Sequence, residues 1–509
     1  MSREVAQPRG SDPGVPYLIR KATPVTGCGA ASAGAARIDR GPPRRVPVVN
    51  GWGSEYALAL AVITRLSVTD FKAFHELEVE LRPITVLVGE NNSGKSSIMA
   101  PLRLLSQTVT SFDSRVPLLL QGELGDFGTY RDVVHGNHRG RPFRIALEFE
   151  EDDAKYGLSL EFKYRTVRRE LILREVTVTE GESARHLITV SHSKDADRYL
   201  ITRLFGRPVP AANRSRMADY LRLFHFLPDL VPARRRGQVR GFLDGFFDER
   251  RALDVMSEID DARWFLRTEF EAIDYIGPMR LAPERSYTQT GETRGRIGAS
   301  GEHWVSILIR ELATSARSET PTPMVEELRR WLKSAGLASD LVPEWASDRY
   351  FELQLRHPVT GEYENLADVG QANGQVLPVL VGGLRLGEGS MFLVEEPEIH
   401  LHPRAQAELG DYFLTLYKRG VWSVIETHSE YLLLRLQQQV AAGDLPASDV
   451  VFYYVGAEAD GKYVRRLSLD AHGRFVEPIP GGFFPERLEE AKNLARLRGD
   501  QMIRAAKAK

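Results

Sequence analysis

A glycine-rich segment around residue 90 constrains the fold of this chain more than any other feature. The apolar run ITVLV at residues 84–88 predicts a strand that is buried on both faces. The segment GENNSGKS follows it directly, and residues 97–105 are typical of a helix, with Pro101 near the first turn. Because a strand, a GxxxxGK[ST] loop and a helix occur in this order, the sequence predicts a phosphate-binding loop in a P-loop NTPase fold of the α/β class.

The chemistry of such a loop assigns roles to its residues. Its glycines allow successive backbone N–H groups to face phosphate oxygens, and the helix N-terminus adds partial positive charge. Lys95 is expected to bind the β- and γ-phosphates of ATP, and the hydroxyl of Ser96 is expected to bind Mg²⁺. The residues predicted to bind nucleotide here are Gly89, Glu90, Asn91, Asn92, Ser93, Gly94, Lys95, Ser96 and Ser97.

A second apolar strand ends in acidic residues. Residues 391–394 read MFLV and are followed by Glu395 and Glu396. In a chain with a phosphate loop, this pattern predicts that Glu395 holds Mg²⁺, directly or through water, and that Glu396 orients and polarises the attacking water. A third apolar run, residues 421–425, ends in ETHS, so His428 lies at a strand end from which it could reach the γ-phosphate.

The order of these motifs resembles that of ABC-type ATPases of the SMC, RecF and overcoming-lysogenisation-defect (OLD) kind. The segments EEPEIHLHP at 395–403 and ETHS at 426–429 are most similar to those of bacterial AAA-family predicted ATPases, and the resemblance extends over about residues 62–485. It implies an ABC-type ATPase head with a mixed core sheet, an antiparallel β subdomain and an inserted helical subdomain. It further implies that His428 is the switch histidine and that Ile399 to His402 face the partner protomer.

The resemblance also implies a signature motif ahead of the second acidic strand, and residues 366–375 (LADVGQANGQ) are the candidate. Relatives place a serine at the position of Gly374, and this serine contacts the γ-phosphate of ATP bound to the other subunit. Without that hydroxyl the sequence predicts slow ATP hydrolysis, and a serine in place of Gly374 is expected to raise the rate. The contacts predicted across the dimer are Gly370, Asn373, Gly374 and Gln375.

Two glutamines are candidates for the loop that completes the Mg²⁺ site. Gln107 and Gln121 both lie in the range that the resemblance implies, and Gln121 is favoured. The predicted metal ligands are therefore Ser96, Glu395 and Gln121.

Other polar side chains have two interpretations. His400 and His402 are spaced like some metal ligands, but no third ligand lies nearby in sequence, so a bound metal is the less favoured interpretation. Arg280 belongs to the segment YIGPMR, which resembles a segment of relatives. It and Arg285 either face phosphate or are structural surface residues.

Patterns along the chain divide it into parts. Short alternating runs between residues 143 and 204 predict an antiparallel sheet, and residues 219–226 and 262–272 read as helices. No heptad pattern persists for three repeats, which excludes a long coiled-coil arm. The predicted parts are a disordered or mis-annotated extension at 1–60, a nucleotide-binding lobe with an antiparallel sheet at 61–210, a helical insertion at 211–345, a second ATPase lobe at 346–485, and a basic C-terminal helix or tail at 486–509.

Composition excludes several classes of protein. The formal net charge is −2, so the chain is not uniformly basic. Cys28 is the only cysteine, which excludes a disulfide framework and a cysteine zinc site and favours a cytoplasmic location. The sequence contains no uninterrupted run of 18 apolar residues, so it predicts no membrane-spanning helix. A local basic cluster of Arg234, Arg235, Arg236 and Arg240 is either a solvated loop or a contact for a nucleic-acid backbone.

The function implied by the resemblance is that of an ATPase that dimerises head to tail around two Mg-ATP molecules and acts as a sensor or regulatory subunit in anti-phage defence. A separate nuclease or toxin effector is expected, because only about 80 residues follow His428, too few for the Toprim domain of OLD-type nucleases. Two alternatives stay open. One is a RecF- or SMC-like ATP-gated DNA-binding protein in DNA repair, and the other is a non-hydrolysing, nucleotide-dependent scaffold.

Overall fold

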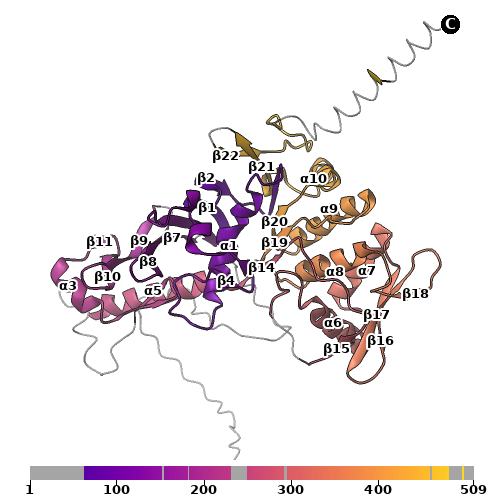
Figure 1. Cartoon of the computed structure of the whole chain (residues 1–509), viewed down its shortest axis with the longest axis horizontal. Coiled ribbons are helices and arrows are strands. Elements are labelled where there is room, and N and C mark those ends of the chain that lie inside the picture. The colour runs from indigo at the N-terminus through magenta and orange to yellow at the C-terminus, as the bar shows by residue number, and fades with distance from the viewer. Residues whose placement is uncertain are drawn as a thin grey trace, which may run out of the picture. The chain divides into compact units, whose positions relative to one another are not determined.

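The computed structural model describes residues 62–151, 154–181, 183–230, 249–291, 295–458, 461–480 and 496–497 (Figure 1). These residues belong to one compact unit, Leu58–Lys509. The expected extension at 1–60, the arginine cluster at 234–240 and almost all of the basic C-terminal segment lie outside the described residues. Within the described part, no helix is both long enough and apolar enough to cross a membrane.

A six-stranded sheet carries the predicted nucleotide-binding residues. Its strand order is β14-β19-β20-β3-β21-β22, and all neighbours are parallel except β21 and β22 (Figure 1). Parallel strands bring their carboxyl ends to one edge, so Gly89, Glu395 and Glu426 end neighbouring strands at the same edge. The strands are β14 (Ile273–Ile276), β19 (Met391–Glu395), β20 (Trp422–Glu426), β3 (Ile84–Gly89), β21 (Val450–Glu458) and β22 (Gly461–Leu467).

Successive residues of the central strands pack into two different cores, which explains the uninterrupted apolar runs. Leu393 of β19 belongs to a core that also includes residues of α1 and α5. Phe392 and Val394 belong to a second core with residues of α8 and α9. The helices that form these cores are α1 (Lys95–Val109), α5 (Glu249–Glu271), α6 (Trp304–Ser318), α7 (Pro323–Ala335), α8 (Gln371–Leu384), α9 (Pro403–Lys418) and α10 (Glu430–Ala442).

An eight-stranded antiparallel sheet confirms the alternating runs expected between residues 143 and 204. Its order is β11-β10-β9-β8-β7-β6-β1-β2. Phe143 is central to its core, with ring centroids 5.6 Å from Phe71 and 5.3 Å from Phe162. The strands are β1 (Val62–Phe71), β2 (Phe74–Glu80), β6 (Phe143–Glu151), β7 (Ala154–Arg165), β8 (Glu170–Glu180), β9 (Arg185–Ser193), β10 (Arg198–Leu204) and β11 (Arg207–Pro208).

Smaller elements complete the described part. A four-stranded sheet of order β15-β17-β16, with β18 paired to β17, packs near α6 and α7. Its strands are β15 (Tyr287–Thr288), β16 (Asp340–Trp345), β17 (Tyr350–Arg356) and β18 (Tyr363–Asn365). The remaining elements are β4 (Gln121–Gly122), β5 (Gly125–Asp126), α2 (Tyr130–Val133), η1 (His135–Asn137), α3 (Ala211–Met217), β12 (Leu221–Phe224), β13 (Leu227–Leu230) and η2 (Ala447–Asp449).

One helix expected from the sequence is wrong. Residues 219–226 form no helix, because Leu221–Phe224 pairs with Leu227–Leu230 as an antiparallel hairpin. His225 lies at the turn with φ of 59°, in the left-handed region that ends a regular element. The other expected helix, 262–272, lies almost entirely within α5.

The segment 211–345 also differs from the helical insertion expected. Besides its helices it contributes β14, which is an edge strand of the core sheet. Asp274 holds this strand in place, since its carboxylate accepts from the amide of Ile297 at 3.2 Å and pairs with Arg385 at the end of α8. The division of residues 61–485 into lobes therefore stays a prediction.

Candidate active site

The glycine-rich loop connects β3 to α1, as the sequence predicts. Gly89 and Gly94 have φ of 141° and 107°, and Asn92 has φ of 63°. A Cβ atom on Gly89 would lie 2.1 Å from the carbonyl oxygen of Val455 on β21, so only glycine fits there. Glu90 and Asn91 are exposed between these turns. This is the backbone arrangement that turns N–H groups toward a bound anion.

Lys95 is the first residue of α1, and its side chain folds back over the loop. Its Nζ donates to the carbonyl oxygens of Gly89 at 3.1 Å and Glu90 at 2.8 Å. The same atom lies 3.8 Å from Oε1 of Glu426. Only 3% of the side chain is exposed, and this burial lowers the pKa of Lys95, while the nearby carboxylate of Glu426 raises it. The site therefore has a buried cation where phosphate is expected.

Ser96 points toward the end of β20 rather than toward β19. Its hydroxyl donates to Oε2 of Glu426 at 2.8 Å. Burial, followed by the negative charge of Glu395, raises the pKa of Glu426 to about 7, while the bond from Ser96 and the charge of Lys95 lower it. Sequence reasoning assigned no role to Glu426. The available signal was its position, because a residue that ends β20 pairs in register with Glu395, which ends β19.

The carboxylate of Glu395 accepts hydrogen bonds from residues of α1 and β14. Its Oε1 accepts from the hydroxyl of Tyr275 at 3.0 Å and from the guanidinium of Arg103 at 3.1 Å. Arg103 also stacks on the Tyr275 ring at 3.6 Å and donates to the carbonyl of Leu124. Burial raises the pKa of Glu395, and the charge of Arg103 lowers it. Tyr275 begins the segment YIGPMR noted in the sequence, but no spacing or motif relates it or Arg103 to Glu395.

Glu396 has an unusual backbone. Its φ is 45°, in the left-handed region that favours glycine. Three hydrogen bonds hold it there. Its amide donates to the carbonyl of Glu426 at 2.7 Å, and its own carbonyl accepts from Arg280 at 3.1 Å and from the amide of Ile399 at 3.3 Å. Arg280 also donates to the carbonyl of Glu395 at 2.7 Å. Burial lowers the pKa of Arg280 to about 10.

These contacts decide between the two interpretations of the arginines. Arg280 is 7% exposed and lies behind the end of β19, so it is not a surface residue. Arg285 is exposed and pairs with Asp368, with 2.9 Å between Nη1 and Oδ2. Arg285 therefore forms a surface ion pair with Asp368, which belongs to the expected signature segment.

His428 follows β20 and lies near Lys95 and Glu396. Its backbone amide donates to Oε1 of Glu398 at 2.6 Å, which ties the loop after β20 to the loop after β19. The side chain of His428 is exposed, and partial burial together with the charge of Lys95 lowers its pKa. The structure thus brings the histidine to the same edge of the sheet as the phosphate loop.

The expected signature segment forms the N-terminus of α8. Gly370 caps the helix and is exposed together with Gln371. Asn373 is buried, and with Gly370 it lines a cleft of about 220 Å³. Among the residues that the structure describes, none bonds to its Oδ1. Gln375 donates to the carbonyl of Arg280 at 3.5 Å, which links α8 to the end of β19 through that arginine.

The surroundings of Gly374 bear on one expectation. A Cβ atom at this position would lie 2.4 Å from Cγ of Pro283, inside any real contact distance. A serine therefore fits there only if Pro283 moves. The expectation that Gly374→Ser raises the rate of hydrolysis stays a prediction, and it requires that movement.

The two candidate glutamines are held differently. Gln107 is buried, and its Nε2 donates to the carbonyl of Leu119 at 2.6 Å. Gln121 is exposed on β4, and among the described residues it makes no hydrogen bond with Ser96 or Glu395. The β4–β5 hairpin still reaches the site, because the carbonyl of Leu124 accepts from Arg103 at 2.7 Å.

The donor atoms at the loop suit a magnesium ion. Mg²⁺ prefers oxygen ligands and is usually bound by one or two carboxylates together with substrate phosphates. Ser96, Glu395 and Glu426 supply a hydroxyl and two carboxylates. Across the described ranges, no three His, Cys, Asp or Glu side chains gather as a metal site of their own. His402, the second histidine of the i, i+2 pair, caps α9 by accepting from the amide of Arg404.

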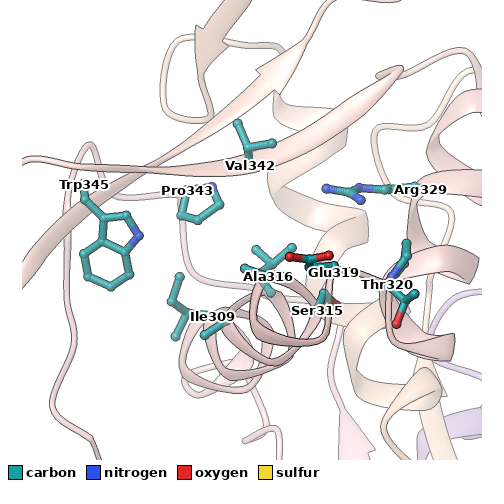
Figure 2. Close-up of a pocket in the computed structure, with 12 residues that line it drawn as sticks. Ile309, Ser315, Ala316, Glu319, Thr320, Arg329, Val342, Pro343 and Trp345 are labelled. Atoms are coloured by element: carbon teal, nitrogen blue, oxygen red, sulfur yellow. The ribbon is translucent and has the colours of Figure 1, made fainter.

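A separate pocket of about 470 Å³ lies between α6, the segment before α7, and β16. Figure 2 shows Pro343 of β16 directed toward Ile309 and Ala316 of α6, with Arg329 at one side. None of its lining residues belongs to the phosphate loop or to the acidic strand ends. It is therefore distinct from the candidate active site.

A protein-family model described as "AAA domain, putative AbiEii toxin, Type IV TA system" matches residues 84–435. The match covers more than half of the chain. It begins with β3 and ends within α10, so it includes the phosphate loop, both acidic strand ends and His428. None of the curated proteins matches this sequence.

Solved structures of SMC heads are similar in part. The SMC head bound to the C-winged helix domain of ScpA shares 13% identity at a TM-score of 0.38, over 80% of this chain and 98% of that one. The SMC head domain from Thermotoga maritima shares 11% identity at 0.36, over 79% and 98%. An Smc head with an extended coiled coil, bound to the C-terminal domain of ScpA derived from Pyrococcus furiosus, shares 12% at 0.38, over 86% and 100%. At these TM-scores, the ABC-type P-loop fold rests on the family match and the strand order.

The raised pKa of Glu426 predicts a pH dependence of stability. The folded chain holds this proton up to about pH 7, whereas an unfolded glutamate releases it near pH 4.5. The contribution to the free energy of unfolding is therefore fully present below about pH 4.5 and is lost as the pH rises through 7. Glu426→Gln removes the titrating group. We therefore expect the free energy of unfolding of the variant, relative to that of wild type, to rise by about 2–3 kcal/mol from pH 5 to pH 8.

Urea unfolding at both pH values measures this gain. Glu388→Gln, at an exposed glutamate before β19, is the control and should follow wild type. A constant difference between wild type and Glu426→Gln at both pH values would contradict the assigned pKa.

Proposed function

This chain belongs to the AAA-domain family that matches residues 84–435, and from that premise we propose that it binds Mg-ATP at the candidate active site and hydrolyses it slowly. One observation carries the proposal. Lys95 and Ser96, at the start of α1, meet the acidic ends of β19 and β20 beside a loop whose glycines have positive φ. A buried cation, a hydroxyl and paired carboxylates at the carboxyl edge of a parallel sheet are the parts that phosphoryl transfer from ATP requires.

The residues of this edge divide the work. Backbone N–H groups of residues 89–96 bind the phosphates, and Lys95 contributes the cation for the β- and γ-phosphates. Ser96 and a carboxylate at the strand ends would hold Mg²⁺, which would supply positive charge against the phosphoryl oxygens. The half-buried Glu396 accepts a proton from the attacking water, and its fixed backbone favours one orientation of the carboxylate. His428 lies beside it at the strand end and contacts the γ-phosphate.

We further propose that two copies pair head to tail, so that α8 of one completes the site of the other. The exposed N-terminus of α8 at Gly370 supports this, because unpaired N–H groups and the helix dipole favour an anion. Asn373 lines the cleft beside it. Slow turnover follows from Gly374, which supplies no hydroxyl and faces Pro283.

The biological role proposed is that of a regulatory ATPase in a defence module, with a separate effector. The family description names a toxin of a toxin–antitoxin system, which supports a role in a system made of two partner proteins. ATP-dependent pairing of two heads gives such a subunit two states, and an effector can bind one of them more tightly.

Lys95→Ala tests nucleotide binding. The variant loses the phosphate-binding cation and also the two bonds that close the loop on Gly89 and Glu90. We expect ATP affinity to fall by about a hundredfold or more, which corresponds to roughly 2.7 kcal/mol. Equilibrium titration with ATP and Mg²⁺ measures it. Lys333→Ala, at an exposed lysine of α7, is the matched control and should bind as wild type does. Equal affinity of Lys95→Ala and wild type would show that the loop does not bind ATP.

Glu396→Gln tests hydrolysis. The amide keeps the shape of the side chain but cannot accept a proton from water, so turnover should fall by about a hundredfold or more. ATP binding should persist, and light scattering after size exclusion should show a longer-lived dimer with ATP than wild type forms. Glu388→Gln serves as the control for loss of a carboxylate elsewhere. Normal turnover in Glu396→Gln would assign the proton acceptor to another acid.

A further inference from the structure

Two carboxylates end adjacent strands at the candidate site, and only one of them contacts the phosphate loop. Glu426 accepts the hydroxyl of Ser96 at 2.8 Å and lies 3.8 Å from Nζ of Lys95. It ends β20, the strand between β19 and the loop strand β3, and pairs in register with Leu87 of β3. Its side chain is 7% exposed. The loop residue expected to bind magnesium is thus already bonded to this glutamate.

Glu395 is engaged elsewhere. Its Oε1 accepts hydrogen bonds from Tyr275 and Arg103. Arg103 also stacks on the Tyr275 ring and donates to the carbonyl of Leu124. The carboxylate therefore has a cation and a hydroxyl donor of its own on the β14 side of the site. A magnesium ion bound by Glu395 would have to compete with the guanidinium of Arg103 for it.

We propose that Glu426, rather than Glu395, is the acidic residue that holds the magnesium ion of Mg-ATP together with Ser96. Glu395 is a positioning residue that fixes Arg103, Tyr275 and the end of β19. This assignment rests on the proposed function, since it requires ATP to bind at the loop. It moves the metal contact from the end of β19, which Glu396 follows, to the end of β20, which precedes His428.

A second consequence concerns ATP without metal. In its ionised form, the Glu426 carboxylate 3.8 Å from Lys95 offsets the cation that the phosphates need, and it repels phosphate oxygens placed at the loop. Metal-free ATP should therefore bind weakly to wild type, and Mg²⁺ should improve binding because its charge compensates Glu426. Replacing Glu426 by glutamine removes both effects, so metal-free ATP should bind more tightly and the benefit from Mg²⁺ should shrink.

The experiment measures the dissociation constant of the fluorescent nucleotide MANT-ATP in EDTA and in Mg²⁺, for the full-length chain. The ratio of the two constants reports the metal contact and does not depend on turnover. We expect wild type to bind at least about tenfold more tightly with Mg²⁺, and Glu426→Gln to reduce this ratio about tenfold or more. Glu269→Gln, at a buried glutamate of α5, is the control for loss of a buried carboxylate and should keep the wild-type ratio.

Glu395→Gln separates the two assignments. Its ratio should stay within about twofold of wild type, because the residue acts through Arg103 and Tyr275. An unchanged ratio in Glu426→Gln would overturn the proposal, and so would a loss confined to Glu395→Gln. A loss in both variants would overturn the positioning role of Glu395. Wild type that binds MANT-ATP under neither condition would instead overturn the proposed function.

Folding of each variant is checked by its thermal melt. If Glu426→Gln does not fold, Glu426→Asp makes the same test, because the shorter carboxylate keeps its charge but withdraws from Ser96. We expect an intermediate ratio for it, and a wild-type ratio would overturn the proposal.

Discussion

Two buried carboxylates at the ends of adjacent parallel strands are the constraint on which the rest of the site depends. Glu395 and Glu426 pair in register on β19 and β20, and both are largely buried. Buried like charges are costly unless each has its own partner. Glu426 has Lys95 and Ser96, and Glu395 has Arg103 and Tyr275. Three of these four partners lie on α1, so the helix that carries the phosphate loop is tied to the sheet through the acids.

The same ends of the strands connect the site to the signature segment. Arg280 donates to the carbonyls of Glu395 and Glu396 and accepts, through its own carbonyl, from Gln375 of α8. The backbone of Glu396, with φ of 45°, is thereby held between β20 and Arg280, which Gln375 links to the first turns of α8. If two heads pair as proposed, a movement of α8 would be transmitted to the proposed proton acceptor through Gln375 and Arg280.

Local sequence order was sufficient to predict the loop and the acidic strand ends. ITVLV, MFLV and VWSVI form adjacent strands, and GENNSGKS connects the first of them to α1, because apolar runs flanked by glycines or acids carry their own signal. The hydrogen-bond partners of those acids could not be predicted from the sequence. Arg103 and Tyr275 meet Glu395 from far along the chain, and no spacing rule relates them. The crowding of Gly374 by Pro283 could not be predicted either, because only the packing of the folded chain brings the two residues together. Residues 219–226 were misread because a short amphipathic run fits a hairpin as well as a helix.

A crystal structure of the chain grown with Mg²⁺ and the slowly hydrolysed nucleotide ATPγS tests the central claim most directly. We expect density for the triphosphate inside the loop of residues 89–96, with Lys95 turned from the carbonyls of Gly89 and Glu90 toward it. We also expect the metal beside the hydroxyl of Ser96. Nucleotide bound elsewhere, such as in the pocket between α6 and β16, with the loop unchanged, would show that the loop is not the ATP site.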